Sequence, residues 1–406
     1  MYKYYIYTLG CKVNSCDSND ISNNLLNLGF SMDTPENADI IIVNSCAVTS
    51  ESVRKARQNI SKFKRINKNV FLILTGCASI LDEFKDNKNV DLISDRNSII
   101  KNIKSRFVTS NISNNIFNFS DLKNKTRFFM KIEDGCENFC SYCIIPFTRG
   151  KIKSKKLDEI EYECKNISNL GFKEIILTGI NLGKYGKDLK VNLLDAIQIV
   201  RKYFSRIRLS SLEPDTINDD LIDYLSSFSE ICPHFHLSLQ SGSNRILKKM
   251  NRKYDIEFYF DLIEKIRNKF NNVTFATDLI VGFPDENEDD FEKSIDAIRK
   301  IKFIKVNVFP FSPRPFTLAE KLKPINGELK KYRVKKSIEV AEEISKNEIS
   351  KFFGKKFNVL FETKELDSDN KFIYSGYSEN YIKIRKKSDE DLCNKIQEVI
   401  FIPYSS

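Results

Sequence analysis

Three cysteines lie close together in the segment DGCENFCSYCIIPFTRG, residues 134–150. Cys136, Cys140 and Cys143 have the spacing CxxxCxxC. A structural zinc site usually takes four ligands, commonly from two CxxC pairs, but the next cysteine here, Cys164, lies in a segment with a helical pattern. Iron–sulfur clusters usually take four thiolates, so three thiolates leave one iron open. The spacing therefore predicts a cluster whose open iron binds a cofactor.

A second set of cysteines is spread over the start of the chain. Cys11, Cys46 and Cys77 each end a short apolar run, in TLGC, VNSC and TGC. Together with helical segments between them, the runs YYIYTLG, ADIIIVNS, VFLILTG and VDLIS are typical of a small parallel sheet with crossover helices. Ligands gather beyond the carboxyl ends of such strands, so we expect the three thiols to converge and bind metal. Cys16 breaks the pattern and is interpreted as a spare thiol.

The composition favours a cytoplasmic protein with reduced cysteines. A chain of 406 residues, 41% of them hydrophobic, predicts two or three domains. No signal-peptide pattern opens the sequence and no apolar run approaches the roughly 20 residues of a membrane helix, so we expect no membrane partner. In a reducing compartment, grouped cysteines indicate metal binding or catalysis rather than disulfides. The isolated Cys164 and Cys393 are interpreted as packing residues.

The charge balance is mildly basic, with a formal net charge of +10. This favours a polyanionic partner without identifying one. The densest basic cluster is VRKARQNISKFKRINK, residues 53–68, in which the basic side chains follow a helical pattern. A solvated helix face explains this cluster as well as an RNA-binding patch does.

The rest of the chain contains two further patterns after an Asn- and Ser-rich linker at residues 107–125. Six apolar runs, FFMKIE, KEIILTG, RIRLSSLEP, HFHLSLQ, VTFATDLIVG and IKVNVFPFS, alternate with helical spacers and predict a complete or partial parallel barrel. The CxxxCxxC loop follows the first of these runs, so its thiols are expected in the barrel mouth. The final runs FNVLFE, KFIYSGYS, YIKIR and EVIFIP predict a small antiparallel β-barrel.

A CxxxCxxC loop after the first strand of a six-unit barrel resembles the radical S-adenosylmethionine enzymes. The resemblance implies a 4Fe-4S cluster, built on the catalytic cysteines Cys136, Cys140 and Cys143, whose open iron is chelated by S-adenosylmethionine. One electron then cleaves the sulfonium to a 5′-deoxyadenosyl radical. The protein's part is to hold the reactive carbon against the substrate and to exclude water.

The whole chain resembles the methylthiotransferases of that superfamily, which install a thiomethyl group at an unactivated carbon. The motifs that carry this resemblance are TLGCKVN, VNSCAVT, TGCAS, YCIIPFTRG, LQSGS, MNR and VGFP. The resemblance implies a second 4Fe-4S cluster on Cys11, Cys46 and Cys77, and a tRNA substrate. The fold class it implies is α/β, with a methylthiotransferase N-terminal sheet domain in residues 1–120, a partial (β/α)6 radical S-adenosylmethionine barrel in residues 126–346 and a TRAM-like RNA-binding β-barrel in residues 351–406.

Five barrel residues are candidates for binding S-adenosylmethionine. Gly179 in LTGINLGKYG and Gly282 in LIVGFP would let backbone approach the cofactor closely. Glu213 in RLSSLEP would accept a ribose hydroxyl, and Arg252 in MNRKY would pair with the cofactor carboxylate. The fifth candidate, Gln240, belongs to a polar strand face.

That polar face lies in HFHLSLQSGS, where alternation puts His234, His236, Ser238 and Gln240 on one side of the strand. We interpret it as the polar interior of the barrel, with a structural histidine nearly as plausible. An HxH pair is also typical of metallohydrolases. These are the only two histidines of the chain, and that chemistry normally recruits more ligands.

TLGCKVN and RLSSLEP resemble the branch that acts on N6-threonylcarbamoyladenosine beside the anticodon. In this mechanism one S-adenosylmethionine methylates a sulfur at the second cluster and another starts hydrogen abstraction from C2 of the adenine. Polar residues near the end of the sixth strand, Asn307, Ser312 and Arg314, are expected to favour a polar substituent, since an isopentenyl group would leave them unpaired.

The sequence departs from the family pattern at two turns. Asp285 in VGFPDEN stands where the family favours glycine. Pro315 and Phe316 in FPFSPRPFTLA stand where a glycine-containing turn is usual. Both departures concern substrate positioning and leave the cluster cysteines intact.

Several alternatives and partners stay open. The alternatives are a methylthiotransferase for N6-isopentenyladenosine or for a ribosomal-protein aspartate, a non-catalytic zinc-containing RNA-binding protein, and a thiol redox protein. We expect a monomer that also needs a sulfur source and an electron donor, neither identified by the sequence. The tail from Lys351 is expected to contact RNA through exposed side chains, among them Tyr377, Tyr381, Lys383 and Arg385.

Overall fold

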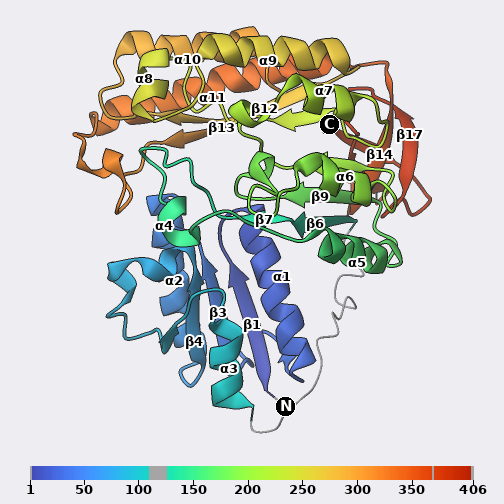
Figure 1. The fold of residues 1–406 in the computed structure, drawn as a ribbon. Coiled ribbons are helices and arrows are strands. Elements are labelled where there is room, and N and C mark those ends of the chain that lie inside the picture. Colours follow the sequence, from blue (N-terminus) through green and yellow to red (C-terminus); the bar gives the residue numbers. More distant parts are fainter. Residues whose placement is uncertain (1, 109–125, 368–369, 404–406) are drawn as a thin grey trace. The chain divides into compact units, whose positions relative to one another are not determined.

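The computed structural model describes residues 2–108, 126–367 and 370–403 (Figure 1). The chain divides into two compact units. The first contains Met1–Lys123, Asp134–Lys151 and Ser312–Lys321, and the second contains Asn124–Glu133, Ile152–Phe311 and Leu322–Ser406. The CxxxCxxC loop thus groups with the N-terminal residues. The predicted linker at residues 107–125 lies almost wholly outside the described residues.

The first unit is built on a parallel five-stranded sheet in the order β2-β1-β3-β4-β5. The four predicted strands are present, and β2 is a two-residue edge strand that the sequence pattern did not reveal. The bounds are β1 (Lys3–Thr8), β2 (Ser31–Met32), β3 (Ile40–Ser45), β4 (Phe71–Gly76) and β5 (Leu92–Ile93).

Helices cover both faces of this sheet (Figure 1). On one face, Tyr4 shares a buried core with α1 (Lys12–Asn27) and α3 (Ile99–Phe107). On the other face, Tyr5 and Tyr7 pack edge-on against Phe63 of α2 (Ser50–Ile66), at ring-centroid distances of 5.8 and 5.4 Å. Successive strand residues point to opposite faces, so this unit is a doubly wound α/β domain. Its carboxyl edge carries Cys46 and Cys77.

The second unit contains the six predicted barrel strands, all parallel. They form two three-stranded sheets, β10-β9-β6 and β11-β12-β13, which isolated parallel bridges connect at Ile207–Ile231 and Leu212–Leu237. The strands are β6 (Arg127–Lys131), β9 (Glu174–Thr178), β10 (Ile207–Leu209), β11 (His234–His236), β12 (Thr274–Val281) and β13 (Lys305–Pro310). The predicted partial barrel is confirmed.

Helices follow these strands and close the outer face. They are α5 (Leu157–Ser168), α6 (Leu193–Val200), α7 (Asp219–Ser226), α8 (Asn244–Lys249), α9 (Ile256–Lys269), α10 (Glu288–Ile301) and α11 (Gly327–Ser350). A short pair, β7 (Glu133–Asp134) and β8 (Lys153–Ser154), flanks the CxxxCxxC loop. Among the described residues, no helix combines the length and the apolar character needed to cross a lipid bilayer.

The C-terminal module is a four-stranded antiparallel sheet in the order β16-β15-β14-β17, as the four predicted runs indicate. The strands are β14 (Lys356–Leu366), β15 (Phe372–Tyr377), β16 (Lys383–Lys387) and β17 (Ile396–Ile400). Phe357, Phe361 and Tyr374 lie in its buried core. The module has its own core and continues from α11.

A buried ionic cluster joins this module to the barrel. Glu174, which is 0% exposed, binds Arg206 and Arg208 at 2.6 and 3.0 Å, and Arg127 lies 3.4 Å away. Burial raises the pKa of Glu174, but Arg208 and Arg127 outweigh it and lower the pKa to about 2. Arg206 also donates to the backbone carbonyl of Tyr377 at 2.8 Å. The arginines therefore satisfy a barrel carboxylate and module carbonyls together.

The prediction that Tyr377 and Tyr381 are exposed is wrong, because both side chains are only partly exposed. Their rings stack at 4.7 Å, and the Tyr381 ring stacks at 4.7 Å on His234 of β11. Arg127 lies over the Tyr377 ring at 4.8 Å. Alternation along the strand could not distinguish a surface turned to solvent from one packed on the barrel. Lys383 is exposed, and exposed Arg385 pairs with Glu365.

Candidate functional site

The cysteines of the first unit follow adjacent strands. Ser45 and Gly76 pair in register at the ends of β3 and β4, so Cys46 and Cys77, the next residues, leave the sheet edge side by side. Both are buried, at 7% and 2% exposure. Cys11 is exposed and lies at the start of α1, three residues beyond β1. The predicted convergence at the carboxyl edge is therefore present in the backbone.

A glycine makes room for this arrangement. Gly10 has φ +110°, and a Cβ there would lie 2.8 Å from Cβ and 3.2 Å from Sγ of Cys46. Both the left-handed backbone and the lack of space exclude a side chain. The segment before Cys11 thus lies directly against Cys46.

The surroundings of the two buried sulfurs suit cluster ligands. Burial raises the pKa of the Cys46 thiol to about 11, with further increases from Cys77 and Cys11, although the Val48 N–H donates to this sulfur at 3.5 Å. Arg96 donates to Sγ of Cys77 at 3.8 Å. A neutral buried thiol becomes a thiolate once a metal compensates its charge. Donors to sulfur are also found around iron–sulfur clusters, where they tune the reduction potential.

The CxxxCxxC loop is closed by its own backbone. Cys136 donates its N–H to the carbonyl of Gly150 at 3.0 Å. Gly135 has φ +88°, and a Cβ there would lie 2.1 Å from the carbonyl oxygen of Lys151. The loop ends in α4 (Ile145–Arg149). All three cysteines are partly exposed: Cys136, Cys140 and Cys143.

Arg149 fastens this loop to the N-terminal sheet domain. Its guanidinium binds both oxygens of Asp134 at 2.8 and 2.9 Å. Its other terminal nitrogen donates to Asn14 at 2.5 Å and to Asp17 at 2.8 Å, both on α1. The side chain is buried, and its two terminal nitrogens are held by two carboxylates and an amide oxygen in place of water.

Two further contacts extend the network to the N-terminal cysteines. Asn14 donates to the carbonyls of Leu9 at 2.7 Å and of Ser45 at 3.1 Å, which precede Cys11 and Cys46. Arg96, which donates to Cys77, also donates to the carbonyl of Thr148 in α4 at 3.3 Å. The first unit therefore ties both sets of cysteines to one another.

The thiols fit two clusters better than single ions. In the part of the chain that the structure describes, no three Cys, His or carboxylate side chains meet around one metal-ion position. The thiolates of an iron–sulfur cluster bind different irons, so their sulfurs stay further apart than the ligands of one ion. An all-cysteine donor set fits such a group at both sites, and at the N-terminal site the glycine beside Cys46 and the N–H donors to Cys46 and Cys77 fit it as well.

Two of the predicted cofactor contacts meet in the second unit. Glu213, four residues beyond β10, forms an ion pair with Arg252. Burial raises the pKa of Glu213, and Arg252 opposes this shift. Arg252 also donates to the hydroxyl of Tyr254 at 3.2 Å. The sequence predicted two separate contacts, and the structure brings them together as one charged pair.

The other three candidates follow neighbouring strands of this unit. Gly179 directly follows β9, and a Cβ there would lie 2.7 Å from Oε2 of Glu133. Gln240 lies beyond β11 with φ 64°. Gly282 directly follows β12 with φ +73° and donates its N–H to Glu286 at 2.7 Å. All three lie at carboxyl ends of strands, where barrel enzymes bind ligands.

Three polar side chains, His236, Asp278 and Asn307, form a polar layer on the inner face of the sheet β11-β12-β13. Leu279 and Val308 share a core with α10 and α11, so Asp278 and Asn307 point to the opposite face. Asn307 donates to Asp278 at 2.9 Å, and His236 lies 3.3 Å from the same carboxylate oxygen. His236 and Asp278 keep 21% and 27% of their side chains exposed. His234, by contrast, is buried, bonds to Thr274 at 2.8 Å and is a structural histidine.

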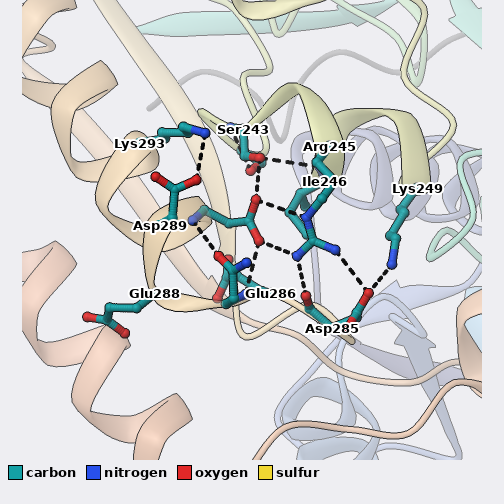
Figure 2. Close-up of polar contacts among 12 residues, drawn as sticks. Ser243, Arg245, Ile246, Lys249, Asp285, Glu286, Glu288, Asp289 and Lys293 are labelled. Carbon is teal, nitrogen blue, oxygen red and sulfur yellow. Dashed lines mark hydrogen bonds and ion pairs between the residues drawn. The ribbon is translucent and has the colours of Figure 1, made fainter.

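The departure at Asp285 has a local explanation. Asp285 has φ 67°, which glycine adopts more easily. Its carboxylate binds Arg245 and Lys249, two residues of α8, so the aspartate serves here as a link between this turn and that helix (Figure 2). Arg245 also binds Asp290; burial raises the pKa of Asp290, but hydrogen bonds from Arg245 and Ser243 lower it to about 2.

Ser312 and Arg314 differ from their predicted role. They belong to the first unit, where Ser312 bonds to Ser50 at 2.7 Å and Arg314 donates to Ser50 at 2.5 Å. Arg314 also donates to the carbonyl of Ala47, next to Cys46, at 3.4 Å. Protein groups already satisfy both side chains, and Asn307 donates to Asp278, so none of the three predicted residues is left unpaired.

Sequence reasoning missed Arg149, Asn14, Arg96 and Asp278. Arg149 and Asn14 stand inside the quoted motifs YCIIPFTRG and TLGCKVN, but only the cysteines in these motifs were given a role. Polar residues within a few positions of each cysteine were the available signal. Arg96 had no such signal, because its contact with Cys77 spans two strand ends.

Comparisons with known proteins agree with this organisation. The radical SAM superfamily matches residues 130–298, and the uncharacterized protein family UPF0004 matches residues 3–94. The chain is 36% identical over 394 residues to the threonylcarbamoyladenosine tRNA methylthiotransferase MtaB of Thermotoga maritima, covering 93% of this chain and 90% of that protein. It is 32% identical over 436 residues to the tRNA-2-methylthio-N(6)-dimethylallyladenosine synthase of Alkaliphilus oremlandii, covering 98% and 89%.

A solved structure supports the fold alone. The radical S-adenosylmethionine methyltransferase TsrM of Kitasatospora setae, solved with cobalamin and a 4Fe-4S cluster, superposes with a TM-score of 0.54 at 13% identity. The match covers 79% of this chain and 77% of that one.

Proposed function

The chain belongs to the tRNA methylthiotransferases of the radical S-adenosylmethionine superfamily, and we propose that it acts on N6-threonylcarbamoyladenosine beside the anticodon. This family uses S-adenosylmethionine and two 4Fe-4S clusters. The product is 2-methylthio-N6-threonylcarbamoyladenosine, and the tRNA substrate assigns the enzyme to the cytoplasm.

The observation that carries the substrate assignment is the polar layer of His236, Asp278 and Asn307. Its side chains stay partly exposed on the inner face of the strand layer. A threonylcarbamoyl group offers a carboxylate, a hydroxyl and a urea linkage to such donors and acceptors. A dimethylallyl group offers none, so it would displace water from this partly exposed layer without giving hydrogen bonds in return.

We propose that Cys11, Cys46 and Cys77 hold one cluster, and that the second is held by the loop cysteines, Cys136, Cys140 and Cys143. When bound, these clusters and S-adenosylmethionine supply the electron, methyl and radical chemistry that no side chain can provide. The protein's share is to orient the cofactor and the substrate and to exclude water.

Residues around the clusters have distinct positioning roles in this proposal. Arg149 fixes the CxxxCxxC loop to α1, and Arg96 fixes α4 to Cys77. In the barrel, the pair Glu213 and Arg252 presents a carboxylate to a ribose hydroxyl and a cation to the cofactor carboxylate. Gly179 and Gly282 keep the strand ends free of side chains.

A second candidate substrate is N6-isopentenyladenosine. The 32% identity to a dimethylallyladenosine synthase, over 98% of this chain, favours it nearly as strongly as the 36% relative favours the first. The two substrates share the whole cluster chemistry. They differ only in the group that faces the polar layer.

The test uses a strain that makes both N6-threonylcarbamoyladenosine and N6-isopentenyladenosine but lacks its own methylthiotransferases for them. This strain is complemented with the protein. Its tRNA is digested and resolved by mass spectrometry. We expect the thiomethyl mass increase on N6-threonylcarbamoyladenosine. A thiomethyl mass on isopentenyladenosine, with the threonylcarbamoyl nucleoside unchanged, would overturn the substrate assignment and keep the chemistry.

A further inference from the structure

Three exposed phenylalanines form a cluster on the CxxxCxxC loop. Phe139, Phe147 and Phe316 are 54%, 46% and 54% exposed. Phe147 lies between the other two, with ring centroids 6.2 Å from Phe139 and 5.9 Å from Phe316. Aromatic rings of this size are normally buried, so three that touch one another and remain exposed indicate a contact surface.

Two of these rings are held on strained backbone. Phe139 has φ 47° and Phe316 has φ 69°, a region that bulky residues rarely adopt. The N–H of Phe316 donates to Glu320 at 3.1 Å, and the exposed ring makes a side contact with Phe147 at 5.9 Å. Strain of this kind persists where the ring serves a function.

The segment that carries Phe316 is fixed to the loop and to α2. Ala319 donates its N–H to the carbonyl of Ser141, inside the CxxxCxxC loop, at 2.8 Å. Ser50, the first residue of α2, donates its N–H to Ser312 at 3.0 Å. All these residues belong to the first unit. The phenylalanine cluster therefore has a defined position beside the N-terminal end of α2.

Helix α2 carries unpaired positive charge towards its C-terminal end, about 18 Å along the helix from Ser50. Arg54 and Lys55 are neutralised by Glu51. Lys62 and Arg65 are exposed one turn apart and make no ion pair within the described residues. Exposed rings and unpaired cations on the same unit suit a nucleic acid long enough to reach both, because its bases stack and its phosphates bind cations.

We propose that Phe139, Phe147 and Phe316 stack unpaired bases of the tRNA anticodon loop, and that Lys62 and Arg65 bind phosphates of the same RNA. The inference rests on the proposed tRNA function and adds where the loop is held. The modified adenosine lies in that loop, so bases flanking it must come close to the cluster loop during reaction.

The first test measures the affinity of the cluster-loaded enzyme for a fluorescent anticodon stem-loop RNA. Phe316→Gly removes the ring and relieves the left-handed backbone, so we expect about tenfold weaker binding with an unchanged or raised Tm. Phe147→Ala should weaken binding to a similar degree. Phe258→Ala, at a 41% exposed ring of α9 in the second unit, is the matched control and should bind normally.

The second test uses salt. The association constant for RNA falls as salt rises. Lys62→Gln and Arg65→Gln should each make the slope of log association constant against log salt concentration less steep by about one. Lys293→Gln, which removes a cation already paired with Asp289, is the control and should leave the slope unchanged. Together the two tests separate stacking from phosphate contact.

The outcomes are separable from the substrate proposal. Each measurement is run on RNA with threonylcarbamoyladenosine and on RNA with unmodified adenosine, and the loss for Phe316→Gly should be equal on both. The product assay judges the substrate independently. Unchanged RNA affinity of both Phe316→Gly and Phe147→Ala overturns the inference. A lowered Tm, with RNA affinity lost equally in Phe258→Ala, also overturns it and assigns the rings to packing.

Discussion

Arg149 donates to Oδ1 of Asn14 at 2.5 Å and so joins the CxxxCxxC loop to the helix that follows Cys11. Asn14 in turn donates to the carbonyls of Leu9 and Ser45, which precede two N-terminal cysteines. One buried guanidinium thus positions segments of both cysteine sets. Coupled chemistry at two clusters requires that kind of fixed geometry.

We predict that Arg149→Lys uncouples the reaction. A lysine keeps the charge but cannot bind Asp134, Asn14 and Asp17 at once. We expect 5′-deoxyadenosine still to form while methylthiolated tRNA falls at least tenfold, because cleavage needs one cluster and transfer needs both. Measuring both products in one reaction gives the ratio. A proportional fall of both products would show a general loss of the fold, for which circular dichroism is the control.

The sequence predicted the parts of this site that depend on local order along the chain. Cys46 and Cys77 follow strand ends, and glycines follow β9 and β12. These positions could be predicted because an apolar run and the small residue that ends it lie in one short segment. Contacts between distant segments were not visible. Arg149 meets Asn14 across 135 positions, and Arg206 meets Tyr377 across 171.

The two incorrect predictions have the same origin. Tyr377 and Tyr381 were expected at the surface of an appended module, but they lie at the end of β15 and in the turn that follows it, against the barrel. Arginines 127, 206 and 208 instead present a cationic barrel surface that the module covers. Arg314 was assigned to the sixth strand by proximity in sequence, yet its hydrogen bonds tie it to the segment after Cys46. Alternation specifies faces and not the partners of those faces.

We predict that Gly10→Ala loses the N-terminal cluster while the fold persists. Its Cβ would lie 2.8 Å from Cβ of Cys46, so the ligand loop must move. Gly29→Ala is the matched control, because Gly29 also has a left-handed φ of +81° but has no neighbour within 4 Å. We expect iron to fall from about eight to about four atoms in the first variant only. Equal iron in both would show that the loop tolerates the side chain.

Replacing the cysteines in sets tests the two proposed clusters. Alanine at Cys136, Cys140 and Cys143 together should halve the iron and abolish cleavage of S-adenosylmethionine. Alanine at Cys11, Cys46 and Cys77 together should also halve the iron but leave cleavage to 5′-deoxyadenosine measurable. Cys164→Ala, on the buried face of α5, is the control for total iron. Cleavage that survives in the first triple variant would refute the assignment of the loop cysteines.

Glu174 gives a prediction about the C-terminal module. Glu174→Gln leaves Arg206 and Arg208 buried without their counter-charge, so we expect the free energy of unfolding at pH 7 to fall by about 3–5 kcal/mol. Glu264→Gln, at an exposed pair with Arg267, should change it by less than about 0.5 kcal/mol. Urea denaturation of both variants measures the difference.

The stability difference between the parent protein and Glu174→Gln should depend on pH. The pKa of Glu174 is about 2 in the fold, against an ordinary value of 4.5, so the folded state favours the charged form. Its contribution to stability is therefore complete above pH 4.5 and is lost as the pH falls from 4.5 towards 2. We expect the stability difference between the parent protein and Glu174→Gln to be constant from pH 7 to pH 5 and to shrink at pH 4 and pH 3. A difference that stays constant down to pH 3 would mean that the carboxylate shape, and not its charge, anchors the module.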